Sequence, residues 1–393
     1  MTATPPSPRV QGSAPAPKVT ATARVPLRFL PVPRRRRASR LRVGHLVVVQ
    51  VAALAVAASL AGPGWVVALT AAGAVVAVAA TFGRRRGRWW YENTVLHRRF
   101  RARRRAARRA RAARQVDPRL VTLAPSTKVG EVELRGNRFG VGLDDSGWFV
   151  AFAVAAPTTA EGERRLIEAV DRLGHILVDT DAPVSSLQLV HHTVPVATLT
   201  SPAGQSVWVA LRLDAADAPA AAAARGGGLA GVHRALAAAV GRVQKTLRAA
   251  GLPYYRVLTG DELADAVASV GGLGDSGRAA ASAGEQWSLW QGPDAAHVCF
   301  RLSGAPTYSL SHLVAGLSQC AVLSFTVTVL LHARGGELAV DALLRVAVAE
   351  QAVAVAVGQV ASLASRIGLE VTRLDGEHGP AVYAAAPTGR SLS

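Results

Sequence analysis

The amino-acid sequence predicts an α/β (α+β) protein in which a two-helix transmembrane hairpin precedes a cytoplasmic domain of two β-α-β-β-α-β halves. Three observations lead to this fold class. Two apolar runs near the N-terminus are separated by a short Gly-Pro-Gly turn, and arginine clusters lie outside both runs. The patterns that follow then repeat one order of strands and helices.

The transmembrane hairpin is predicted over residues 43–83. Its two apolar runs are Leu46–Leu60 and Trp65–Phe82, and only the turn Ala61–Gly64 lies between them. With a few flanking residues each run reaches roughly 18–20 residues, which at about 1.5 Å per residue crosses a hydrocarbon core of about 30 Å. Because the first run starts past residue 40 and a second follows at once, we do not expect a cleaved signal peptide.

Positive charge is concentrated beside the hairpin. Residues 1–119 hold 25 of the 45 Lys and Arg residues and 2 of the 26 acidic residues. Their net charge is therefore about +23, and that of residues 120–393 is about −4. Basic flanks stay cytoplasmic, so we expect two spans in the inner (plasma) membrane with both termini cytoplasmic. A nucleic-acid-binding domain would carry such charge on its own fold, whereas basic residues beside a membrane bind anionic lipid at about 1 kcal/mol each. Anionic lipid is therefore an expected partner, and nucleic acid is not.

The segments on either side of the hairpin differ in composition. Residues 1–42 are rich in Pro, Ala and Arg and are predicted to be a disordered tail. Residues 84–119 are predicted to form a basic juxtamembrane helix, because Ala and Arg favour helices. Trp89, Trp90 and Tyr91 stand where an interfacial aromatic belt would lie. The alternative for this segment is a solvated basic stretch that serves only membrane topology.

The first half of the cytoplasmic domain is predicted over residues 120–270. Strand-like runs flank a turn at Asp144–Gly147, and apolar residues recur at helical spacing between Leu166 and Leu177. Gly251 is placed to end a second helix. The expected elements are strand 149–155, helix 161–178, strand 186–194, strand 207–213, helix 231–250 and strand 253–258.

The second half, residues 285–393, repeats this order after a Gly/Ser/Ala-rich linker at residues 271–284. Its expected elements are strand 296–302, helix 309–317, strand 321–332, strand 337–346, helix 349–366 and strand 369–374. The two helix exits match, as Gly251-Leu252-x-x-x-Arg256 and Gly368-Leu369-x-x-x-Arg373. Both halves thus have the element order of a ferredoxin-like unit. The alternative is one continuous α/β domain with a different connectivity.

Residues that could carry chemistry are few. The sequence contains no phosphate-binding loop, nucleophile elbow, dinucleotide fingerprint or metal-ligand cluster. The carboxylates Asp144, Asp179 and Asp181 are expected in turns or loops. His191 and His192 are neighbours on a predicted strand, so their side chains point to opposite faces and do not suit one metal ion.

Other candidates have structural interpretations as well. Arg225 and the three glycines to Gly228 could expose backbone N–H groups to an anion, or could form a flexible loop. Thr259 and Glu262 have the spacing of a helix capping box. Cys299 and Cys320 lie in apolar segments and are expected to be reduced, small hydrophobic residues. We therefore assign no catalytic, cofactor-binding or metal-binding residue.

The chain resembles the EccE family of membrane components of actinobacterial type VII (ESX) secretion systems. The resemblance covers most of residues 40–390 and is strongest from about 135 to 265. It rests on the hairpin with its Arg-rich exit at Trp89-Trp90, the strand pair Phe139–Leu143 … Trp148, the strand Val207–Leu213 followed by Arg225–Gly228, the helix ending Arg242 … Leu247 … Gly251, and Trp287-x-x-Trp290. The resemblance implies a non-catalytic structural subunit of an inner-membrane complex, without a cofactor, whose partners are EccB, the FtsK/SpoIIIE-like ATPase EccC and EccD.

Two other classes of protein are considered. A membrane-anchored, cytoplasmic-facing enzyme such as a glycosyltransferase-like protein would need a supported carboxylate constellation, which the acidic candidates do not form. A membrane-tethered nucleic-acid binder would need aromatic platforms on one sheet face. Tyr254 and Tyr255 are adjacent and face opposite sides, so they do not make one. The favoured interpretation is a scaffold subunit that supports protein export.

Overall fold

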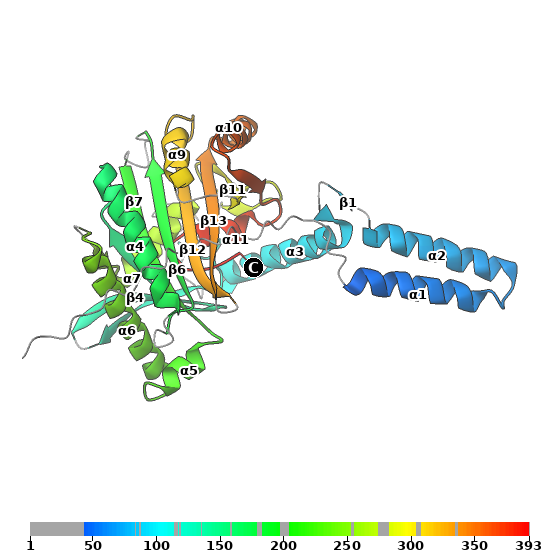
Figure 1. Cartoon of the computed structure of the whole chain (residues 1–393), viewed down its shortest axis with the longest axis horizontal. Helices are drawn as coiled ribbons and strands as arrows, with labels where there is room; N and C mark the ends of the chain where they lie inside the picture. Colours follow the sequence, from blue (N-terminus) through cyan, green and yellow to red (C-terminus); the bar gives the residue numbers. More distant parts are fainter. Residues whose placement is uncertain are drawn as a thin grey trace, which may run out of the picture.

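The computed structural model begins with a pair of apolar helices, α1 (Val43–Ser59) and α2 (Gly64–Phe82), which project away from the rest of the chain (Figure 1). Helix α2 has 19 residues and is long and apolar enough to cross a membrane. Helix α1 has 17 described residues, and the residues before it lie outside the described part, so its predicted length of 18–20 residues stays a prediction. The structure describes residues 43–82, 84–85, 88–113, 117, 119–134, 136–157, 159–178, 183–196, 204–252, 255–273, 283–303, 308–334 and 337–392. The predicted tail at residues 1–42 lies outside this part.

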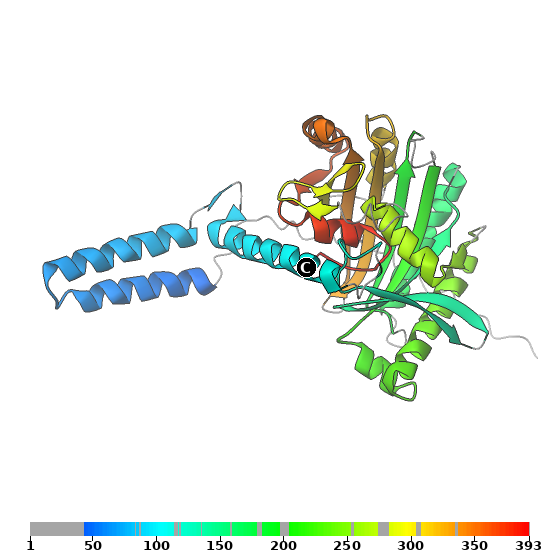
Figure 2. The same ribbon diagram turned by 180° about the vertical axis from the view of Figure 1, so that it is seen from behind.

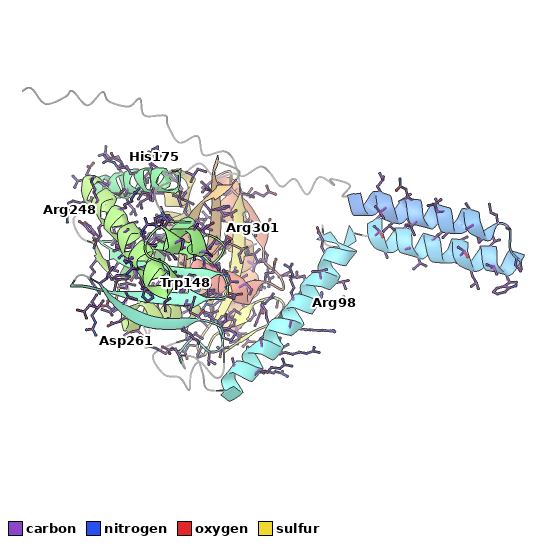
Figure 3. All side chains as sticks on the ribbon, turned by 90° about the horizontal axis from the view of Figure 1, so that it is seen from below. Arg98, Trp148, His175, Arg248, Asp261 and Arg301 are labelled. Carbon is purple, nitrogen blue, oxygen red and sulfur yellow. The ribbon has the colours of Figure 1, made fainter. Side chains whose placement is uncertain are left out.

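The basic segment after the hairpin contains a helix, but this helix starts at Trp90, later than the predicted start at residue 84. The short strand pair β1 (Arg84–Arg85) and β2 (Arg88–Trp89) leads into helix α3 (Trp90–Ala113), which has 24 residues. This helix runs from the hairpin along the flank of the sheet domain (Figure 3). The side chains of Trp89, Trp90 and Tyr91 are not among those described, so the aromatic belt stays a prediction.

The remaining long strands form a single sheet. It has 12 strands, and its main path is β3-β4-β5-β7-β6-β12-β13-β11-β10-β9, with β8 added beside β5 and β14 beside β11. The strands are β3 (Lys128–Leu134), β4 (Asn137–Asp144), β5 (Gly147–Val154), β6 (Ser186–Val194), β7 (Gly204–Asp214), β8 (Tyr255–Val257), β9 (Gly284–Glu285), β10 (Trp290–Gln291), β11 (Ala296–Ser303), β12 (Ser324–Arg334), β13 (Glu337–Val348) and β14 (Glu370–Arg373).

The two predicted halves contribute their strands in equivalent orders. The first half gives the order β8-β5-β7-β6 and the second gives β14-β11-β13-β12. The halves meet where β6 pairs antiparallel with β12, in a register that places Leu189 opposite Val329. They therefore share one continuous sheet. Residues 274–282 of the predicted linker lie outside the described part, so the domain boundaries and the ferredoxin-like assignment stay predictions.

Four amphipathic helices cover one face of the sheet: α4 (Ala160–Val178) and α6 (Gly228–Ala249) in the first half, and α9 (Tyr308–Leu317) and α10 (Val353–Arg366) in the second. Alternate strand residues point to this face because side chains alternate along a strand. In β12, for example, Val329 and Leu331 pack with the first-half helices, and Phe325 and Val327 pack with the second-half helices.

The opposite face of the sheet is covered by different elements (Figure 2). Helix α7 (Gly260–Gly271) packs on the first half, and helix α11 (His378–Ala385) lies across strands of both halves. Nearly all of α11 is buried. Helix α5 (Ala218–Ala223) and the short 3-10 turn η1 (Glu350–Ala352) complete the described elements.

The sequence predicted the long elements within a few residues of their ends. The capping box at the start of α7 is confirmed, because Thr259 Oγ1 accepts from the Glu262 backbone N–H and the Glu262 carboxylate accepts from Thr259 N–H. The sequence did not predict α5, α11, β9 or β10. The C-terminal residues after β14 therefore add a buried helix and a covering segment rather than ending the repeat.

Candidate functional site

Helix α3 is docked on the second half by one face. Its partly or fully buried positions follow a helical stripe from Asn93 to Ala110, and Leu96 and Phe100 are at most 9% exposed. His97 stacks on Trp287, with ring centroids 3.9 Å apart, and Phe100 meets the same indole edge-on at 5.7 Å. The juxtamembrane helix therefore has a packed seat on the segment between β9 and β10.

A partly buried ion pair fixes the register of this docking. Arg103 donates from Nε and Nη2 to the two carboxylate oxygens of Glu285, at 3.1 and 2.9 Å, and its Nη2 also donates to the Gly376 carbonyl at 2.6 Å. The Glu285 side chain is 7% exposed and also accepts from the Gly379 backbone N–H at the start of α11. Such a bidentate pair is geometrically specific, so it selects one position of α3 on the domain.

Gly376 is required at this seat for a steric reason. Its φ is +78°, and a Cβ built on it would lie 2.7 Å from the Trp287 ring. A larger residue there would displace the indole on which α3 packs. The seat is thus built from β9, from Trp287 and from the loop before α11, three parts of the second half that meet only in the fold.

A second polar cluster lies under the C-terminal residues, on the sheet face that α11 covers. The Arg212 guanidinium donates to both carboxylate oxygens of Asp144, and both side chains are at most 2% exposed. Tyr383 donates its hydroxyl proton to Asp144 at 2.9 Å. Burial by itself would raise the pKa of Asp144, but the hydrogen bond and charge of Arg212 outweigh burial, so the pKa lies below its usual value.

The C-terminal segment is held to both halves by side chains of the sheet. Gln188 donates to the Ala384 carbonyl at 2.6 Å and accepts from the backbone N–H groups of Thr388 and Gly389. From β12, Thr328 donates to the Ala385 carbonyl at 3.0 Å. Because these bonds run to backbone atoms, the sheet determines the path of the covering segment rather than offering a reactive surface.

A third group surrounds Arg345, which is 1% exposed. Its guanidinium donates to His297 Nδ1 at 2.9 Å and to Thr326 Oγ1 at 3.0 Å, and His192 Nδ1 lies 2.9 Å from the same hydroxyl. Burial, reinforced by the Arg345 charge, lowers the pKa of His192 to about 3. Burial also lowers the pKa of Arg345 to about 10, so at neutral pH a charged guanidinium is bound by neutral acceptors.

The candidates that the structure describes, Asp144, His191 and His192, do not form a reactive constellation. Asp144 also accepts from the backbone N–H groups of Ser146 and Gly147, which confirms its turn role. His192 Nδ1 lies 2.9 Å from Thr326 Oγ1, and its neighbour His191 points to the opposite face of β6 because side chains alternate along a strand. Asp179 and Asp181 lie outside the described residues.

The remaining candidates also have structural surroundings. The Arg225 carbonyl accepts from Arg234 Nε at 2.6 Å, which closes the glycine loop before α6. Burial raises the pKa of the Cys299 thiol to about 12, so the thiol stays protonated at neutral pH. Cys320 is partly exposed at the end of α9. Among the residues that the structure describes, no three His, Cys, Asp or Glu side chains are grouped to hold a metal ion.

One small hollow lies between β12, β13 and the C-terminal segment, lined by Arg301, Asp341, Arg390 and Leu392 among others. Its room for solvent is about 10 Å³, which corresponds to about one water molecule. Pockets that bind small molecules typically have about 300–1,000 Å³. This hollow therefore does not suit an organic substrate.

One stretch of the chain matches a known protein family. Residues 201–302 match the family model described as "Putative type VII ESX secretion system translocon, EccE". Over these residues, about a quarter of its length, the chain is similar to the EccE family. The matched region runs from before β7 to the end of β11, so it crosses from the first half into the second and includes Glu285 and Trp287, which hold α3. The description of that family names a component of a type VII secretion system. A comparison with curated proteins gave no match.

Sequence reasoning did not find the α3 seat or the C-terminal cluster. Trp287 belonged to the motif that suggested the family, but its contact with His97 and Phe100 joins segments far apart in the chain. The apolar positions Leu96 and Phe100, spaced four apart in an arginine-rich helix, are the signal that could have shown a docked face.

Proposed function

We propose that this chain is a structural, non-catalytic subunit of a type VII secretion inner-membrane complex that supports protein export. The observation that carries the proposal is the docking of α3, which couples the apolar hairpin to the sheet domain through packed aromatic rings and the Arg103–Glu285 pair. Such a coupling suits a subunit that holds the cytoplasmic part of an assembly in a fixed position relative to its membrane part. The buried polar groups of Gln188 and Thr328 hold the backbone of the C-terminal segment, which supports a scaffold rather than an enzyme.

In this proposal both α1 and α2 span the inner membrane, with both termini cytoplasmic. At about 1.5 Å per residue the 17 residues of α1 extend about 26 Å, close to the shortest spans that cross a bilayer. Helices α1 and α2 contact each other, and their partly buried positions include Ala52, Val56, Thr70 and Ala74. The arginine-rich flank at α3 supports the cytoplasmic placement of the sheet domain.

The topology has a direct test by cysteine labelling in intact cells. A cysteine in place of Gly62, in the turn between α1 and α2, is expected to react with a thiol reagent that cannot cross the membrane. A cysteine in place of Ser126, an exposed position before β3, is expected to stay unlabelled until the cells are opened. Labelling of position 126 in intact cells would rule out this topology.

The proposed partners are EccB, EccC and EccD, with anionic lipid at the basic juxtamembrane segment. Ala57 and Gly73 lie on exposed faces of the hairpin, and a Cβ at Gly73 would meet nothing within 4 Å. Small residues let helices of other subunits approach closely in lipid. The hairpin therefore offers a face to other spans.

The proposal is tested by replacing Ala57 and Gly73 together with leucine. The bulkier face is expected to loosen the membrane complex while the sheet domain stays folded. Native gel electrophoresis of solubilised membranes should lose the large species, and affinity purification followed by mass spectrometry should recover fewer type VII subunits. If wild-type chain recovers no type VII subunit at all, the scaffold function itself is wrong.

A further inference from the structure

Helix α10 presents an outer face that differs from that of its counterpart in the first half. Helices α6 and α10 each connect the third strand of their half to the fourth, on the same face of the sheet. The exposed side of α6 carries Arg234, Arg242, Lys245 and Arg248. Residues 346–365, which include almost all of α10, contain one charged residue, Glu350. The fold therefore tolerates charged residues on the exposed side of such a helix. The absence of charge from the exposed side of α10 is not a requirement of the fold.

The outer face of α10 is exposed in the single chain. Its members recur at helical spacing and are uncharged: Gln351, Ala354, Val355, Gly358, Ala361, Ser362 and Ser365. Val355 is 62% exposed, and Leu323 beside α9 is 36% exposed. Residues 302–333, which include α9, also contain no Asp, Glu, Lys or Arg. Depletion of charge with exposed aliphatic side chains is characteristic of the buried centre of a protein interface.

The charged residues at the two ends of this uncharged face indicate what kind of partner it meets. Glu350 and Arg366 stand equally far along the chain on either side of Gly358, both are exposed, and neither forms an ion pair with another described residue. Two α10 helices that pack antiparallel about a two-fold axis at Gly358 bring Glu350 of each copy to Arg366 of the other. Residue pairs exchange in this way across any isologous two-fold interface.

We propose that α10 is the contact between two copies of this chain, packed antiparallel and crossing at Gly358. The uncharged face meets itself without like-charge repulsion, unlike the basic faces of α3 and α6. Gly358 leaves open space, since a Cβ there would meet nothing within 4 Å, so two backbones have room to approach.

The direction of α10 agrees with two copies in one membrane. Figures 1 and 2 view α10 almost end-on, whereas the hairpin lies across the page. A two-fold axis along the hairpin direction therefore relates two antiparallel α10 helices and leaves both hairpins on the same side of the pair. Confinement to one membrane raises the effective concentration of the copies, so an interface of modest area suffices.

The experiment is disulfide formation between full-length chains in membranes, in a Cys320→Ser background. Gly358→Cys should give a covalent dimer on mild oxidation, because the residues meet at the axis. Gly241→Cys is the matched control: it lies on the exposed side of α6, where a Cβ also meets nothing within 4 Å, and it should give at least tenfold less dimer. Equal yields at the two positions would refute the proposal, as would capture of a different protein at position 358.

Charge reversal tests the register independently. In the Gly358→Cys chain, Glu350→Arg or Arg366→Glu alone should lower the dimer yield severalfold, because like charges then meet, and the double reversal should restore it. Failure of the double variant to recover would rule out the antiparallel pairing. Gly358→Leu should weaken self-association in detergent by about tenfold, a loss of about 1.4 kcal/mol. Gly241→Leu should leave it unchanged, and leucine favours the helix itself at both sites.

Discussion

Replacing Asp144 with alanine is expected to lower the free energy of unfolding by about 3–5 kcal/mol, since it removes the buried carboxylate that pairs with the Arg212 guanidinium and leaves that guanidinium only the half-exposed Asp214, 2.9 Å from its Nε. Asp144 and Arg212 side chains are 0% and 2% exposed, and the same carboxylate accepts from Tyr383 and from two turn N–H groups. The measurement is denaturant unfolding of the full chain in detergent, followed by tryptophan fluorescence. Asp144→Asn should cost less, because the amide oxygen still accepts hydrogen bonds.

The adjacent carboxylate provides a matched control. Asp145 pairs with Arg390 at the surface, and its side chain is 59% exposed. Exposed ion pairs contribute about 0–1 kcal/mol, so Asp145→Ala should change stability by less than about 1 kcal/mol. Equal effects of the two alanine variants would mean that the buried pair does not hold the C-terminal segment.

The contribution of Asp144 has a defined pH dependence. Its pKa is lowered in the folded chain, so the stability that its charge provides is present above its unfolded pKa of about 4. This stability is lost as the pH falls through the lower folded pKa. The difference between wild type and Asp144→Asn should therefore be constant near neutral pH and should shrink only below about pH 4.

The structural role of Asp144 also affects how a loss of secretion in the Asp144→Asn variant is interpreted. From the sequence, secretion is expected to survive Asp144→Asn because no catalytic role is assigned to this residue. The structure adds that the carboxylate is a stabilising group in a buried cluster. A loss of secretion in this variant must therefore be compared with the amount of folded chain before it is taken as a sign of catalysis.

The elements that the sequence predicted well have strong local patterns. Helix α4 carries apolar residues at helical spacing over its whole length, and the Thr259–Glu262 capping box is encoded within four residues. Strand β6 was predicted at its observed ends because its apolar residues are bounded by turn residues. For such elements a local window contains all the information that determines them.

The features that escaped prediction depend on distant partners. Helix α11 is buried on nearly all sides, so it has no polar face and its apolar residues show no stripe. Strands β9 and β10 have two residues each and exist through pairing with each other and with β11. Arg212 meets Asp144 from a different strand, and no spacing in the sequence marks that pair. The candidate site was missed because it is assembled from such long-range contacts.

Disrupting the α3 seat is expected to free the juxtamembrane helix from the sheet domain. Phe100→Ala removes the ring that meets Trp287 and a side chain only 9% exposed. Truncations of buried aromatic residues cost about 3–5 kcal/mol, a large share of what holds one helix. The Arg103–Glu285 pair then remains as the main polar contact, because the other α3 arginines whose side chains the structure describes are exposed.

Limited digestion with trypsin measures this release. Arg98, Arg99, Arg101, Arg104 and Arg105 are exposed cleavage sites, but a protease cuts a helix only after it opens locally. If docking limits opening, Phe100→Ala should be cleaved within α3 at least tenfold faster than wild type, since a loss of about 1.4 kcal/mol already changes the open population tenfold. Val95→Ala, on the solvent side of the same helix at 46% exposure, should be cleaved at the wild-type rate.

The same variants distinguish attachment of the chain to the membrane from the fixed position of the sheet domain relative to the hairpin. In Phe100→Ala the apolar hairpin is unchanged, so the chain should still fractionate with membranes. The sheet domain, however, no longer has a fixed position relative to the hairpin, and the large complex on native gels should diminish while it persists in Val95→Ala. A Phe100→Ala chain that is cleaved rapidly yet assembles and secretes normally would show that the hairpin serves only as a tether. Because the Phe100–Trp287 contact is what the scaffold proposal depends on, that result would remove its main support.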